Sequence, residues 1–193
     1  AAPAAHAQFA IEPGSAVAKA HAGDPAGPAV TQAGAHPDLT VAFDLTTHID
    51  NGTEMPFESL RDVRVELPPG FVGNSEATPK CRHRDFVTGN CDRTAIVGVD
   101  ELTLRLGGGS INTQVLPVYN LVPRDGAVAQ LGFQFATVSV VLTVSVRSDG
   151  SYNLATDLTN ASQGVAIFGN KLTLWGVPAD KNGPGPLNFG FPV

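Results

Sequence analysis

Apolar and polar residues alternate along most of the chain from residue 38 onward. A period of two places the apolar side chains on one face of an extended strand. Turn residues such as Asn51-Gly52 separate these stretches. Together they predict an all-β protein of roughly nine to eleven strands, a β-sandwich that is jelly-roll-like or Ig-like. The clearest stretches are residues 38–47, 62–67, 94–106, 113–122, 130–135, 137–147, 152–158, 164–169 and 171–176.

Two of these stretches contain an irregularity. In TAIVGVDELTLRL, the phase set by Val97 and Val99 slips by one residue before Leu102 and Leu104, which predicts a β-bulge or tight turn near Asp100. In TQVLPVYNLV, Pro117 lacks a backbone N–H and predicts an edge position or a second bulge.

Residues 1–37 differ from the rest because they are rich in alanine, glycine and proline. This composition predicts an extended N-terminal arm that precedes a β-sandwich domain of residues 38–193, with residues 13–37 as a flexible spacer. Within the arm, AQFAIEP alternates Ala7, Phe9 and Ile11, which predicts a short strand.

The last eight residues, PLNFGFPV, also alternate. Leu187, Phe189, Phe191 and Val193 fall on one face of a predicted C-terminal strand. Such a strand fills either the core of its own domain or an interface with a neighbouring copy.

Charge and hydropathy exclude several classes of partner. The net charge is −6 with only 12 Lys and Arg, and no basic stripe is present, so we expect no nucleic-acid partner. No apolar run approaches the length of about 18–20 residues that a membrane span requires.

Cys81 and Cys91 enclose a short loop in CRHRDFVTGNC. They are either two free buried thiols or a disulfide, and the absence of paired C-x₂-C spacing argues against a zinc site. A disulfide is favoured, and it would imply an oxidising compartment. An alanine-rich start without Met is typical of a chain whose secretion signal has been removed. We therefore expect a secreted, extracellular protein of the cell surface.

The sequence contains no recognisable catalytic motif: no G-x-S-x-G elbow, no P-loop and no H-E-x-x-H. We therefore expect no enzyme activity, no cofactor and no metal. Trp175, Tyr119 and Tyr152 are the aromatic residues that a sugar-binding platform would use.

Several phrases are specific in wording and order: TQAGAHPDLTVAFDLTT, LRDVRVELPPGFVGNSEATPKC, DFVTGNC, PVYNLVP, VSVRSDGSYNL and LTLWGVPAD. Over residues 31–180 the chain resembles the N-terminal module of large secreted surface proteins of high-GC Gram-positive bacteria. The resemblance implies an extracellular, β-rich, disulfide-bearing module without a recognised active site. Two departures are Ser75, where the family has proline, and 92–94, where it has a proline-containing stretch. Members of that family continue far beyond this point, so a chain that stops after KNGPGPLNFGFPV is expected to be a self-contained subunit.

These features favour a structural subunit of an extracellular filament, a pilus-like fibre or a surface layer. In this hypothesis the subunits assemble with copies of themselves by donor-strand exchange, with the N-terminal strand as the preferred donor. The alternative is a monomeric secreted module that binds a cell-surface polysaccharide.

Overall fold

The computed structural model describes residues 9–182, and nearly all of its regular structure is β-strand. The strands are β1 (Val17–His21), β2 (Asp38–Asp44), β3 (Thr47–Asp50), β4 (Thr53–Pro56), β5 (Val63–Glu66), β6 (Ile96–Arg105), β7 (Ile111–Leu121), β8 (Ala129–Phe135), β9 (Val138–Val146), β10 (Leu154–Leu158) and β11 (Ala166–Leu174). The helical segments are α1 (His83–Val87), η1 (Arg93–Ala95) and α2 (Pro178–Lys181).

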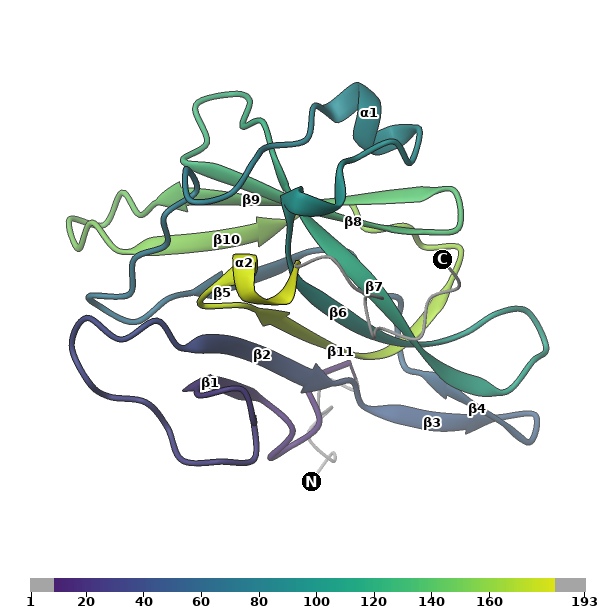
Figure 1. Cartoon of the computed structure of the whole chain (residues 1–193). Helices are drawn as coiled ribbons and strands as arrows, with labels where there is room; N and C mark the ends of the chain where they lie inside the picture. The colour runs from purple at the N-terminus through teal and green to yellow at the C-terminus, as the bar shows by residue number, and fades with distance from the viewer. Residues whose placement is uncertain (1–8, 183–193) are drawn as a thin grey trace.

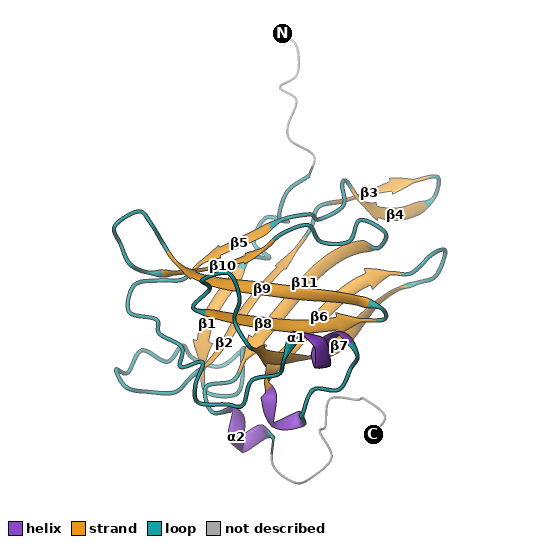
Figure 2. Ribbon diagram, turned by 90° about the horizontal axis from the view of Figure 1, so that it is seen from above, coloured by secondary structure: helices purple, strands orange, loops and turns teal. Residues whose placement is uncertain are grey.

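Nine strands form one antiparallel sheet in the order β1-β2-β11-β6-β7-β8-β9-β10-β5, and β3 and β4 form a separate hairpin. The long sheet curls so that β8, β9 and β10 lie across from β2, β11 and β6 (Figures 1 and 2). The prediction of an all-β, sandwich-like protein is confirmed. Because β11 lies between β2 and β6, the last strand of the described residues joins β1 and β2 to the hairpins formed by β6 to β10.

The inner face of the curl carries the main hydrophobic core. Strands β6, β7 and β8 supply its buried residues, which are Leu102, Leu104, Leu116, Val118 and Phe133. The alternation seen in the sequence explains this, because every second residue of an antiparallel strand points to the same face.

The predicted bulge in β6 exists, but its predicted position is wrong. Register with β7 shifts between Ile96 and Gly98, so the extra residue is Val97. From Gly98 onward the burial of β6 alternates without interruption, and Asp100 is in phase with Leu102 on the inner face. Pro117 lies in β7 beyond the part that pairs with β8, which begins at Tyr119, so this portion of β7 is locally an edge as expected.

Part of the predicted flexible spacer is strand. Val17–His21 pairs in full with β2, so the spacer interpretation is wrong for these residues. Alanine has weak β-propensity, and tertiary contacts supply what the local sequence lacks. His21 is buried, its Nε2 lies 2.8 Å from Thr40 Oγ1, and Thr40 Oγ1 lies 2.8 Å from Thr173 Oγ1, so a polar chain ties β1 to β2 and β11.

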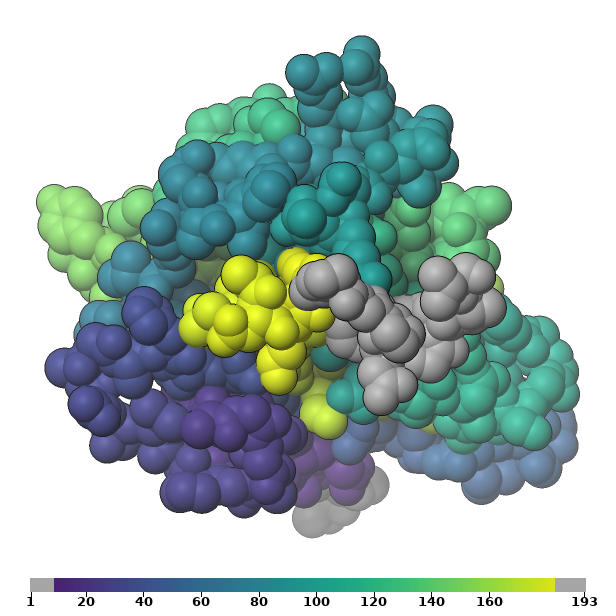
Figure 3. Space-filling view, viewed as in Figure 1, coloured from purple at the N-terminus to yellow at the C-terminus, as the bar shows by residue number. Residues whose placement is uncertain are grey.

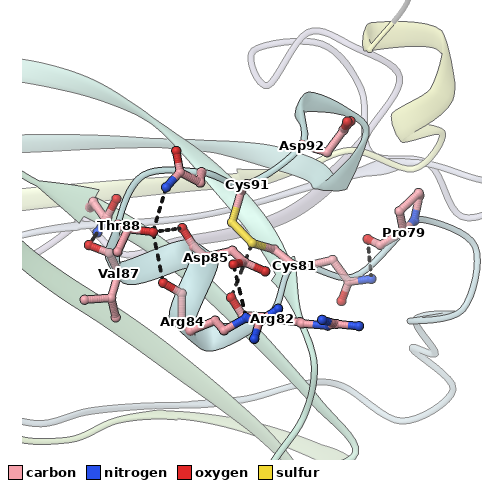
Figure 4. The surroundings of a disulfide bond; sticks show 12 residues. Pro79, Cys81, Arg82, Arg84, Asp85, Val87, Thr88, Cys91 and Asp92 are labelled. Carbon is pink, nitrogen blue, oxygen red and sulfur yellow. Dashed lines mark hydrogen bonds and ion pairs between the residues drawn. A yellow bond between two sulfur atoms is a disulfide. The ribbon is translucent and has the colours of Figure 1, made fainter.

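A second, smaller cluster lies on the outer side of the sheet under α1. Its buried residues are Cys81, Phe86, Ala95 and Leu121. Cys81 and Cys91 form a disulfide, as predicted, and it brackets α1 (Figure 4). The chain at Cys81 is also held to β7, because Cys81 N donates to Asn120 O at 2.8 Å and Val122 N donates to Cys81 O at 2.9 Å.

Removing the disulfide is expected to destabilise the protein by roughly 2–3 kcal/mol, because the cross-link restricts a short loop in the unfolded chain. Urea denaturation of a Cys81→Ser, Cys91→Ser double variant beside the wild type would measure the difference. A reducing agent should destabilise the wild type by a similar amount and leave the variant unchanged. Equal midpoints for reduced and oxidised wild type would contradict the prediction.

Candidate functional site

The concave face of the curled sheet lines a cavity of about 1050 Å³. That volume lies just above the range of about 300–1,000 Å³ typical of sites for small ligands. Its walls are largely apolar, and many of the wall residues are only partly buried although they lie on the core face. These partly buried residues include Val41, Phe43, Val63, Val65, Leu131, Phe135, Val140, Val144, Leu154, Ile167 and Leu172. Within residues 9–182, part of the hydrophobic core is therefore left uncovered.

One end of the cavity is closed by loops and by α2. Residues 30–37 before β2, residues 67–74 after β5, and Pro178 and Ala179 of α2 all line it. In the space-filling view, α2 (yellow) lies between the N-terminal segments (purple to blue) and the teal loops (Figure 3). Asn182 Nδ2 donates to Ile96 O at 2.6 Å and so fixes the chain after α2 to the start of β6.

A single carboxyl group, that of Asp100, is buried in the wall of the cavity. Asp100 is 1 % exposed, and Asn170 Nδ2 donates to its Oδ1 at 2.7 Å. Its Oδ2 is buried without a hydrogen-bond partner. Burial raises the pKa of Asp100 to about 7, against the lowering effect of the Asn170 hydrogen bond, and the nearby charge of Glu101 adds to the rise. The sequence gives one signal for this site, an acid in phase with Leu102 and Leu104, which the misplaced bulge obscured.

A second polar side chain, Asn120, also lines the cavity and organises its loop. Its Nδ2 donates to Ser75 O at 2.9 Å and to Thr78 O at 3.2 Å. Asn120 is 2 % exposed, and these partly buried hydrogen bonds hold the loop before the disulfide against β7. This role was not predicted from the sequence.

The edge of the sheet at β5 is free within the described part of the chain. β5 pairs with β10 on one side and stands last in the strand order on the other. Val63 and Val65 face the cavity, whereas Arg64 bonds Asp157 at 2.8 Å and Glu66 bonds Arg147 at 3.0 Å on the outer surface. A strand added here would therefore meet an apolar inner side and a charged outer side. The opposite edge, β1, is partly covered by its own loop, since Val30 N donates to Ala20 O at 2.9 Å.

The predicted N-terminal contact strand lies along its own chain where it is described. Ile11 forms an antiparallel bridge with Leu45, Glu12 N donates to Asp44 O at 2.8 Å, and Thr46 N donates to Ala10 O at 2.9 Å. Phe9 and Ile11 are 37 % and 50 % exposed, so neither side chain enters the core. Ala7 lies outside the described residues, as do Leu187, Phe189, Phe191 and Val193 of the predicted C-terminal strand.

The three aromatic residues considered for sugar binding have different surroundings. Trp175 lines the cavity, Tyr119 packs edge-on against Phe86 with ring centroids 6.2 Å apart, and Tyr152 is 81 % exposed next to a turn. Within residues 9–182, no three His, Cys, Asp or Glu side chains are grouped as metal ligands would be. The helices of the same residues are too short to cross a membrane.

Comparison with protein-family models, with curated proteins and with solved structures finds no match for this chain.

Proposed function

We propose that this protein is a structural subunit of an extracellular filament or surface layer, assembled by β-strand complementation between copies. The observation that carries the proposal is the apolar cavity next to the edge of β5, both of which are left uncovered by residues 9–182. An extended segment from another copy would hydrogen-bond to the edge of β5 and place every second side chain in the cavity.

The energetics of the cavity are compatible with this role. Burying one large apolar side chain contributes roughly 1.5–3 kcal/mol, so three or four in phase supply about 5–12 kcal/mol. Part of that gain is lost in ordering the donated segment and in fixing two molecules together. Backbone hydrogen bonds to β5 add affinity, and the fit of alternate side chains in the cavity supplies specificity.

The geometry favours strand complementation over polysaccharide binding. A sugar site combines polar groups with an aromatic platform, whereas most of the cavity wall is apolar, although Trp175 and polar side chains such as His36, Asp100, Asn120 and Asn170 also line it. Tyr119 and Tyr152 do not line the cavity at all. The disulfide supports placement in an oxidising compartment, as an extracellular subunit requires.

A charge at the free edge should block assembly. In Val65→Lys, an ammonium group would point from β5 toward the cavity, and inward-pointing charges are how edge strands resist pairing. We expect filaments of the wild type by negative-stain electron microscopy, and single particles of the variant. Light scattering would give a mass near 20 kDa for the variant.

The matched control is Val146→Lys on β9, which makes the same change at a side chain that is 47 % exposed and outside the cavity. This control should still assemble, and circular dichroism should show both variants folded. A wild type that stays monomeric at all concentrations would refute the proposed function, as would filaments that tolerate Val65→Lys.

A further inference from the structure

We infer that the donated strand is residues 187–193 of a neighbouring copy, inserted along β5 with Leu187, Phe189, Phe191 and Val193 in the cavity. The inference rests on the proposed function and names the segment that serves it. It reverses the preference for the N-terminal arm that the sequence favours.

The first reason is that the N-terminal arm is already engaged. Its described part makes backbone hydrogen bonds to residues 44 and 46 of its own chain, and Ala10 N also donates to Thr46 Oγ1 at 3.0 Å. Donation of Phe9 and Ile11 to a neighbour would break these bonds first. Its alternating set is also small, since Ala7 buries little apolar surface.

The second reason is the match between residues 187–193 and the acceptor edge. The segment alternates four large apolar side chains with Asn188, Gly190 and Pro192, none of which is charged. Paired with β5, the apolar face of the segment would lie beside Val63 and Val65. Its other face, which is uncharged, would lie beside the ion pairs of Arg64 and Glu66. Seven extended residues span about 23 Å, enough to run past all of β5.

The third reason is the position from which the segment leaves the domain. Asn182 is bonded to Ile96 O, and the preceding α2 lines the cavity end. The intervening Gly-Pro-Gly-Pro of residues 183–186 has two prolines, which favour an extended linker. The point at Asn182 from which the chain continues toward residues 187–193 is therefore fixed relative to the acceptor cavity, as a repeating head-to-tail contact requires.

The test compares three full-length variants. The first variant, Phe189→Asp combined with Phe191→Asp, places two charges on the face of the segment that would enter the cavity. The second, Asn188→Asp, places one charge on the opposite face. The third, Phe9→Asp, changes the N-terminal arm. We expect the critical concentration for filaments to rise about tenfold or more in the first variant and to stay near the wild-type value in the other two.

Covalent trapping would locate the inserted segment directly. Chains with Val65→Cys are mixed with separate chains carrying Phe189→Cys under mild oxidation, and the native cysteines are already bonded to each other. Because the two new thiols lie on different molecules, a disulfide-linked dimer on a non-reducing gel shows insertion between copies. Mixing Val65→Cys with Phe9→Cys is the parallel control, and it should give no such dimer.

The outcomes separate the two proposals. Loss of filaments in Phe9→Asp alone, with a dimer only from the Phe9→Cys mixture, overturns the inference and leaves strand complementation standing. Filaments blocked by Val65→Lys but by neither set of donor changes also overturn it. A wild type that is monomeric, with residues 187–193 protected in its own cavity by hydrogen exchange, overturns the inference together with the proposed function.

Discussion

Replacing Asp100 by asparagine is expected to stabilise the protein at neutral pH and to change its stability little near pH 4. The cause is the buried carboxyl group, whose pKa is raised to about 7 by desolvation. In the unfolded chain the same group ionises near the ordinary value of 3.8. Asparagine keeps the oxygen that accepts from Asn170 Nδ2 and removes the charge.

The sign of the pH dependence follows from these two pKa values. Below pH 4 the carboxyl is protonated in both states and does not change the free energy of unfolding. Between about pH 4 and 7 only the unfolded state ionises, so the free energy of unfolding falls by about 1.4 kcal/mol for each pH unit. Above pH 7 both states are ionised and the loss stays constant at about 4 kcal/mol.

Urea denaturation at intervals from pH 4 to 8 would measure this dependence in wild type and Asp100→Asn. The difference between the two curves should grow from near zero to as much as about 4 kcal/mol, less the effect of an unpaired amide N–H. Asp50→Asn, at the exposed end of β3, serves as the control and should follow the wild type. Parallel curves for wild type and Asp100→Asn would show that the carboxyl is ionised in the folded protein throughout this range.

The alternation of apolar residues was enough to predict most strands of the sheet. It identifies the strands that became β2, β5, β8 and β9, because each has one face in the core and one outside. It fails for β1, where VAKAH carries no apolar alternation and the strand depends on His21 and its contacts with Thr40. Local sequence cannot report a strand whose stability comes from its partners.

The candidate site was largely beyond sequence reasoning. The cavity depends on strand order, since β11 must return between β2 and β6 before the inner faces of the two halves oppose each other. The free edge at β5 likewise follows only from knowing that β5 pairs with β10. The burial of Asp100 could have been predicted, because it is in phase with Leu102 and Leu104. A single polar residue among apolar ones, however, is equally consistent with a break in the alternation. By contrast, the disulfide between Cys81 and Cys91 needed only their spacing and the absence of other cysteines.

Replacing Phe86 by alanine is expected to destabilise the protein by about 3–5 kcal/mol, the usual range for truncating a buried phenylalanine. Phe86 is 1 % exposed and is the only buried residue of α1. Five residues are too few for a helix to be stable in isolation, so α1 depends on this side chain and on the disulfide. The ring fits over Gly132 of β8, where an added Cβ would lie 2.7 Å from Phe86 Cζ.

Two further variants test whether this contact is responsible. Val87→Ala removes an adjacent side chain that is 63 % exposed and should change the free energy of unfolding by less than about 0.5 kcal/mol. Gly132→Ala crowds the same ring from the sheet side and should cost about 1–3 kcal/mol. All three can be measured by urea denaturation with the disulfide intact, so that loss of packing is separated from loss of the cross-link. If Phe86→Ala were no more harmful than Val87→Ala, α1 would be held by the disulfide and by backbone hydrogen bonds alone.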